Sequence, residues 1–141
     1  MEVNIAVIGG GYWGKNLIRN FQQLGHLHTI CDASIEALNE FNDVYPDVNT
    51  CTDYQEVLSN KEINAVVIAA PAVLHFELAK KAILHGKDVF VEKPLALNAQ
   101  DGEALVKLAK EKNRILMVGH LLHYHPAINE LKRLVASGEL G

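Results

Sequence analysis

The sequence predicts an α/β protein with one doubly wound, mostly parallel sheet of six strands and with helices on both faces. Three observations support this fold class. Short apolar runs alternate about six times with segments of helical periodicity, the order that right-handed βαβ crossovers require. The run at residues 65–69 is apolar throughout, as in a strand buried on both faces. A glycine-rich turn directly joins the first apolar run to the first helical segment.

This turn has the spacing Gly-x-Gly-x-x-Gly, at Gly9, Gly11 and Gly14. In a dinucleotide site the first glycine permits the tight turn, the second lets the backbone approach the diphosphate, and the third lets the helix pack against the strand. The free N–H groups and the dipole of the following helix favour an anion. The motif alone is a weak signal, so its weight depends on what else reaches the same edge of the sheet.

In the first half of the chain, a helix is expected over residues 12–24, with Gly25 as its C-terminal stop. Its apolar face is expected to comprise Trp13, Leu17, Ile18, Phe21 and Leu24. The other elements expected here are strands at 27–31 and 50–51, a helix at 34–41, and a short helix at 53–58 behind an Asp53 N-cap.

In the second half, strands are expected at 65–69, 88–91 and 115–118. A helix over residues 73–85 should end at Gly86 and point Leu74, Leu78, Ala82 and Ile83 inward. Asn98 is the expected N-cap of a helix that ends at Asn113 and buries Ala104, Leu105 and Leu108. The tail, residues 126–137, should be a helix with one apolar face: Ile128, Leu131, Leu134 and Val135.

Composition narrows the class of ligand. A net charge of −4 and a pI near 5.9 give no electrostatic footprint for a nucleic acid or an anionic membrane, so a small-molecule ligand is expected. The longest apolar run is too short to span a bilayer and is broken by Pro71. Without a recognisable signal peptide, a cytoplasmic location is expected. Cys31 and Cys51 lack a CxxC spacing and are expected to be buried thiols.

Asp32 directly follows the second expected strand, eighteen positions after Gly14. A carboxylate at this point of the fold accepts hydrogen bonds from the adenosine ribose hydroxyls. The next two residues are Ala33 and Ser34 and not an arginine, so a 2′-phosphate would meet a repelling carboxylate and no cation, and NAD is favoured over NADP. In the alternative interpretation, Asp32 caps the helix that begins near Ser34.

Ala70, Pro71, Glu92 and Lys93 follow two further strands and are expected at the same carboxyl edge of the sheet. There, the Lys93 ammonium could hydrogen-bond a substrate hydroxyl and stabilise the alkoxide that develops as hydride leaves. A surface salt bridge between Lys93 and Glu92 is the alternative.

Three histidines lie close together near the end of the last strand: His120, His123 and His125. They lack a cysteine or a carboxylate at a ligand spacing, so no metal site is expected. His120 is expected to face the nicotinamide, whereas His123 and His125 are expected in a hinge or facing solvent.

Together, the glycine turn, Ala70-Pro71 with His75, Glu92-Lys93-Pro94, Gly119-His120 and Tyr124-His125-Pro126 resemble the Gfo/Idh/MocA oxidoreductases. The resemblance implies a Rossmann domain followed by a C-terminal α/β substrate domain. Residues 1–120 are expected to form the NAD(P)-binding domain, and residues 121–141 a linker and helix leading to a substrate domain that is absent from this chain. The tail looks most similar to dehydrogenases of sugar nucleotides.

The resemblance also implies roles for individual residues. It places Tyr12 and Trp13 beside the pyrophosphate, Glu92 near the nicotinamide ribose, and Lys93 beside the nicotinamide and the reacting hydroxyl. It matches three further positions to the cofactor lining: Ala70, Pro71 and His75. His75 could equally be an ordinary histidine on a helix face. Two positions depart from the family pattern, because Ala72 stands where asparagine is common and His123 where arginine is frequent.

The activity implied is NAD-dependent oxidation of a CH–OH group in a sugar, a cyclitol or a sugar nucleotide, with this chain as the cofactor-binding part. The alternative is a free-standing module that binds or senses NAD without catalysis. Exposed apolar faces on the tail helix and the last strand predict homo-oligomers.

Overall fold

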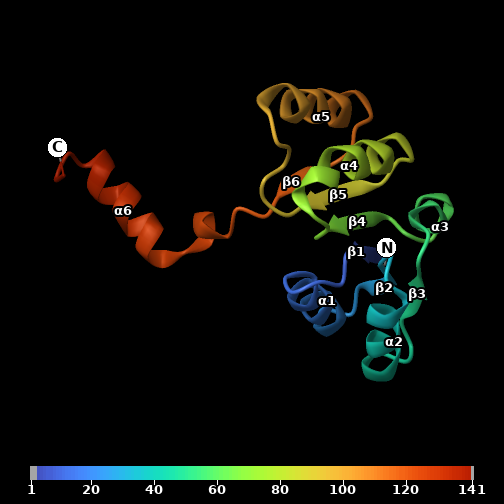
Figure 1. Ribbon diagram of the computed structural model, residues 1–141. Coiled ribbons are helices and arrows are strands. Elements are labelled where there is room, and N and C mark those ends of the chain that lie inside the picture. Colours follow the sequence, from blue (N-terminus) through green and yellow to red (C-terminus); the bar gives the residue numbers. More distant parts are fainter. Residues whose placement is uncertain (1–2, 141) are drawn as a thin grey trace.

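In the computed structural model, which describes residues 3–140, all six strands form one parallel sheet (Figure 1). The sheet order is β3-β2-β1-β4-β5-β6. The strands are β1 (Ile5–Ile8), β2 (Leu27–Cys31), β3 (Asn49–Cys51), β4 (Ala65–Ile68), β5 (Asp88–Val91) and β6 (Leu116–Val118). The α-helices are α1 (Gly14–Gln23), α2 (Ile35–Val44), α3 (Tyr54–Ser59), α4 (His75–Leu84), α5 (Ala99–Glu111) and α6 (Pro126–Ala136), and the 3₁₀ turns are η1 (Ala72–Leu74) and η2 (Leu121–Tyr124).

The order in which the chain adds strands to the sheet reverses next to β1. β1 pairs in parallel with β2 on one side and with β4 on the other, so the connections after β1 and after β4 leave in opposite directions. Such a switch point opens a crevice at the carboxyl ends of the two central strands, where doubly wound sheets bind ligands. The predicted fold class is confirmed, and the glycine turn lies at this crevice.

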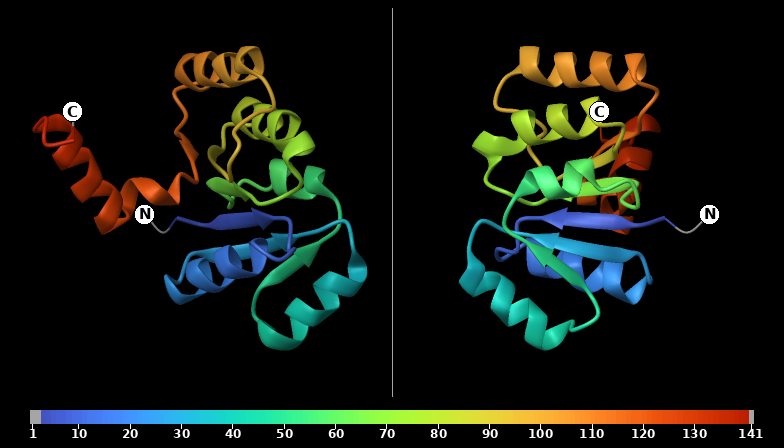
Figure 2. Two further views of the ribbon diagram at one scale, coloured as in Figure 1. Left: turned by 60° about the vertical axis from the view of Figure 1, so that its left-hand side comes forward. Right: turned by 90° about the vertical axis from the view of Figure 1, so that its right-hand side faces the viewer.

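Two hydrophobic clusters, one on each face of the sheet, form the core. In β1, Ala6 and Ile8 point into the cluster covered by α3, α4 and α5, whereas Ile5 and Val7 point into the cluster covered by α1 and α2. Figure 2 shows these two helical layers on opposite sides of the strands. Because helices cover both faces of the sheet, the sequences of the central strands are continuous apolar runs.

The first helix begins at Gly14, two residues later than predicted, because Tyr12 and Trp13 belong to the turn and Trp13 is the N-cap. The predicted apolar face is therefore wrong at its two ends. Trp13 is 40% exposed and Leu24, which follows the helix, is 64% exposed. Ile18, in the middle of that face, is fully buried.

Two other predicted core positions are exposed. Leu74 lies in η1, so the helix predicted at 73–85 consists of a 3₁₀ turn followed by α4. A 3₁₀ turn has 3.0 residues per turn, so the 3.6-residue period does not extend back to Leu74. Ala104 is exposed because α5 is an outer helix that buries only a narrow stripe, of which Leu105 and Ala109 are the centre.

The α6 helix projects from the rest of the chain (Figure 1). None of its residues is buried, and Leu131 and Val135 on its predicted apolar face are exposed. Residues 3–140 contain no helix with both the length and the apolar content needed to cross a lipid bilayer.

Lys87, just before β5, is a buried cation, only 5% exposed. Its Nζ donates hydrogen bonds to the carbonyl oxygens of Asn60, at 2.5 Å, and Ile63, at 2.7 Å. Lys87 forms no ion pair within the part of the chain that the structure describes. Burial lowers the pKa of the Lys87 ammonium below its ordinary value of 10.5.

Because of Lys87, we expect the stability of the fold to change with pH in the alkaline range. The unfolded chain binds this proton more tightly than the native protein, so the free energy of unfolding should rise as pH increases from the lowered native pKa towards 10.5. Urea unfolding of wild type and Lys87→Met across pH 8–11 measures the difference. The exposed Lys107→Met is the control, and an equal pH slope in wild type and Lys87→Met would contradict the expectation.

Candidate functional site

The glycine turn joins β1 to α1 and uses its three glycines in different ways. Gly9 has φ +96°, and a Cβ there would lie 2.9 Å from backbone atoms of Ala69 and Ala70. A Cβ on Gly14 would collide with the Gly9 carbonyl oxygen. Gly11 differs, since beyond its two chain neighbours no residue of the described chain has an atom within 4 Å of a Cβ built there. Two glycines are thus required by the fold, and the third leaves open space above the turn.

Asp32 ties this turn to the end of β2. Its Oδ2 accepts a hydrogen bond from the Gly10 N–H at 2.6 Å, and its Oδ1 accepts one from the Ser34 N–H at 2.9 Å. Ser34 is the N-cap of α2, because its Oγ accepts a hydrogen bond from the Ala37 N–H. The Asp32 carboxylate is half-buried and retains acceptor capacity for further donors.

Gly10 is a site residue that the spacing motif does not identify. A Cβ on Gly10 would collide with the Phe41 ring of α2 and would lie 3.4 Å from Asp32 Oδ2. The available signal was the unbroken Gly9-Gly10-Gly11 run, in which the middle glycine is optional in the general motif.

Glu92 is a buried carboxylate, 6% exposed, at the end of β5. Its Oε1 accepts a hydrogen bond from the Trp13 indole Nε1 at 2.7 Å, and its Oε2 accepts one from the Lys93 backbone N–H at 3.3 Å. A Cβ on Gly119, after β6, would lie 2.9–3.1 Å from this carboxylate group. The Trp13–Glu92 contact and the role of Gly119 were not predicted, because they join segments far apart in sequence.

His75, at the start of α4, is 2% exposed. Its Nδ1 lies 2.6 Å from the Pro94 carbonyl oxygen and its Nε2 lies 2.8 Å from the Ala70 carbonyl oxygen. Both ring nitrogens therefore face backbone carbonyls, and the ring connects the end of β4 to the segment after Lys93.

Six of the predicted site residues line one hollow of about 420 Å³ beside the glycine turn: Tyr12, Trp13, Ala70, His75, Glu92 and Lys93. Asp32 and the three motif glycines lie along the adjoining turn. Pro71 is exposed at the start of η1 and is absent from the lining. Gly119 and His120 line a second hollow of about 750 Å³, which Lys93 and Leu121 share with the first.

The Lys93 side chain is exposed between these two hollows. No carboxylate among residues 3–140 forms an ion pair with its ammonium, and the alternative Lys93–Glu92 salt bridge is not formed. Lys93 thus offers a cation with free donors at the place where the two hollows meet.

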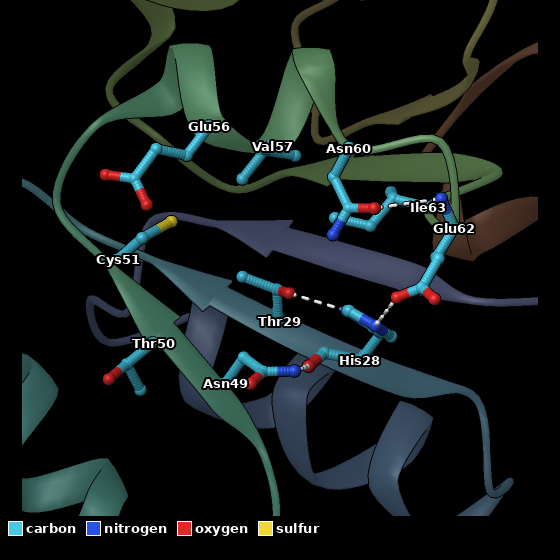
Figure 3. Close-up of a pocket in the computed structure, with 10 residues that line it drawn as sticks. All are labelled: His28, Thr29, Asn49, Thr50, Cys51, Glu56, Val57, Asn60, Glu62 and Ile63. Atoms are coloured by element: carbon cyan, nitrogen blue, oxygen red, sulfur yellow. Dashed lines mark hydrogen bonds and ion pairs between the residues drawn. The ribbon is translucent and has the colours of Figure 1, made fainter.

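A further cavity of about 340 Å³ lies between α3 and the β2–β3 edge (Figure 3). Its wall carries the carboxylates of Glu56 and Glu62, the latter 3.6 Å from His28 Nε2. These carboxylates would repel a diphosphate, and no predicted site residue lines this cavity. Cys51 lines it as well, and Cys51 and Cys31 are free thiols whose pKa values are raised by burial.

Two of the histidines after β6 lie close to each other. The rings of His120 and His123 are 6.2 Å apart between centroids, and His123 Nδ1 lies 3.1 Å from Lys132 Nζ. Among the residues that the structure describes, no three His, Cys, Asp or Glu side chains gather in a group that could hold a metal ion.

This strand order, with a glycine turn after β1 and an acidic residue after β2, defines a dinucleotide-binding domain of the Rossmann type. The chain belongs to the Gfo/Idh/MocA oxidoreductase family, whose NAD-binding Rossmann fold matches residues 3–120.

Known proteins of similar sequence or structure agree with this assignment. An uncharacterized oxidoreductase of Streptococcus pneumoniae serotype 4 is 34% identical over 142 residues, which cover 99% of this chain and 38% of that protein. The crystal structure of myo-inositol 2-dehydrogenase from Lactobacillus plantarum superimposes with a TM-score of 0.88 at 26% identity, covering 100% of this chain and 43% of that one. KijD10, a 3-ketoreductase from Actinomadura kijaniata in complex with NADP and TDP-benzene, shares the fold with a TM-score of 0.87 at 23% identity, covering 98% and 43%. The chain therefore spans about two fifths of the length of these relatives.

Proposed function

We propose that this chain is the NAD-binding part of a dehydrogenase that oxidises a CH–OH group of a sugar, a cyclitol or a sugar nucleotide. One observation carries the proposal: the glycine turn after β1, Asp32 after β2, and Glu92 and Lys93 after β5 converge on one edge of the sheet. Myo-inositol 2-dehydrogenase, with the same fold at 26% identity, supports a polyhydroxylated substrate.

The residues of the turn fit a diphosphate. The space above Gly11 is open to 4 Å in the described chain, so the backbone there can be approached closely by a ligand. The first turn of α1 has no acidic residue, so its N–H groups face no competing negative charge from that turn.

The choice of NAD over NADP rests on Asp32. Its carboxylate is held by the Gly10 and Ser34 N–H groups, so its position at the end of β2 is fixed. A fixed carboxylate can accept hydrogen bonds from both ribose hydroxyls, whereas it repels a 2′-phosphate. The next residue is Ala33, which supplies no compensating cation.

The nicotinamide, when bound, supplies the hydride acceptor. Lys93 can donate a hydrogen bond to the substrate hydroxyl oxygen from the border between the two hollows, and its positive charge stabilises the alkoxide that develops there. His120 lines the second hollow together with Lys93, and there it would face the nicotinamide.

The division of the protein follows from the same proposal. Residues 1–120 form the cofactor domain, and residues 121–141 lead to a second domain that covers the nicotinamide. The exposed apolar positions of α6, Leu131 and Val135, are consistent with burial against such a domain or against a second copy in a homo-oligomer.

Isothermal titration calorimetry with NAD and NADP tests the proposed cofactor. We expect NAD to bind more tightly than NADP, and Asp32→Ala to weaken NAD binding by roughly tenfold, which corresponds to about 1.4 kcal/mol. The control is Asp53→Ala, which removes an Asp that also accepts a hydrogen bond from a backbone N–H, but at the start of α3. Equal or tighter NADP binding by wild type would contradict the assignment.

A further inference from the structure

Glu92 is the point at which three distant segments of the chain meet. Trp13 comes from the glycine turn, Glu92 from the end of β5 and Gly119 from the end of β6. A carboxylate that is 6% exposed must keep its hydrogen-bond partners, because an ionised group without them is costly to bury.

The partners of Glu92 leave Lys93 free. The Trp13 indole occupies Oε1, and the Lys93 backbone N–H occupies Oε2. The ammonium of Lys93 is on the adjacent residue, yet it takes part in no ion pair within residues 3–140. The carboxylate next in sequence to this lysine is thus not paired with its ammonium.

We propose that Trp13 is a positioning residue, whose indole N–H holds the Glu92 carboxylate away from the Lys93 ammonium and so keeps that ammonium free for a substrate oxygen. The part that concerns the substrate rests on the proposed function. The hydrogen-bond relation between Trp13, Glu92 and Lys93 does not.

This purpose requires a side-chain hydrogen-bond donor at position 13. Phenylalanine would occupy much of the same space but has no donor, and the neighbouring Tyr12 is 91% exposed and points no donor at Glu92. Without the indole, Oε1 would be a buried anion that lacks its strongest side-chain donor. Rotation towards Lys93 would then replace the lost hydrogen bond with an ion pair, which would occupy the cation.

Chemical labelling of Lys93 tests this relation without measuring activity. In Trp13→Phe, we expect the rate of Lys93 acetylation by acetic anhydride, followed by peptide mass spectrometry, to fall about threefold, the range of an exposed ion pair. Lys107, which is exposed on α5, is the internal reference. Tyr12→Phe is the matched control in the same turn and should label at the wild-type rate.

Two glutamine variants make the outcome decisive. Trp13→Phe/Glu92→Gln should regain the wild-type labelling rate, because the amide cannot form the ion pair. Glu92→Gln alone should label at close to the wild-type rate. A clear acceleration in Glu92→Gln would show that Glu92 already pairs with Lys93 and would overturn the proposal, even if Trp13→Phe did not fold. An unchanged rate in folded Trp13→Phe would overturn it as well.

Calorimetry of the same proteins separates this inference from the proposed function. Slower labelling in Trp13→Phe supports the positioning role whether or not wild type binds NAD. A wild type that binds no dinucleotide would contradict the proposed function alone.

Discussion

Gly14→Ala is expected to lower the free energy of unfolding by about 3 kcal/mol, at the upper end of the cost of overpacking. The added Cβ would collide with the Gly9 carbonyl oxygen, and a backbone atom cannot move aside by changing rotamer. The turn and the first turn of α1 would have to separate. Urea unfolding followed by circular dichroism measures the loss.

Gly11→Ala is the matched variant in the same turn. Its Cβ meets nothing within 4 Å and its φ is not positive, so its free energy of unfolding should stay within about 0.5 kcal/mol of wild type. The methyl group would occupy the space expected to receive the diphosphate, and NAD affinity should fall roughly tenfold, or by about 1.4 kcal/mol. Equal losses of stability in the two variants would refute this division of roles.

His75→Leu is expected to lower the free energy of unfolding by about 2–4 kcal/mol, because it removes a buried ring whose two nitrogens contact backbone carbonyls. The carbonyl oxygens of Ala70 and Pro94 would both lose their contacts with the His75 ring, which is itself 2% exposed. The segment that carries Lys93 would lose its attachment to β4, so NAD affinity should fall in the same variant.

His85→Leu is the control for this prediction. His85 is an exposed histidine after α4, and its Nδ1 also lies within hydrogen-bond distance of a backbone carbonyl, that of Lys81. Its replacement should change the free energy of unfolding by no more than about 0.5 kcal/mol. A His75→Leu protein as stable as His85→Leu would contradict the interpretation of His75 as a structural link.

Local patterns predicted most of the fold. β2 and β5 begin and end at the predicted residues. A β-branched or apolar run that is bounded by glycine or a polar residue defines both ends of a strand. Ser34, Asp53 and Asn98 all cap helices through side-chain acceptors, and the last two were predicted as caps. The boundaries of α1 and η1 were less accurate, since turn residues and helix residues share the same apolar character.

The sequence predicted which strand ends carry the site residues and which edge of the sheet they share. It did not predict the contacts between these residues. The alternation of elements brings the ends of β1, β2, β4 and β5 to one edge, and this is why the glycine turn, Asp32 and Lys93 could be grouped in advance. In the alternative interpretation Asp32 caps the helix, but the N-cap of α2 is Ser34. The Asp32 side chain instead accepts a hydrogen bond from Gly10, a partner 22 positions away.

By itself, the sequence determined the class of fold, the edge of the sheet at which the glycine turn, Asp32 and Lys93 gather, and the identity of the charged groups there. These depend on periodicity and on short motifs, which act over a few neighbouring residues. Only the tertiary structure decided that Gly10 lies against Phe41, that His75 spans two backbone segments and that Trp13 holds Glu92. Each of these contacts joins residues that the sheet order brings together, and a hydrogen bond across 79 positions leaves no local pattern in the chain.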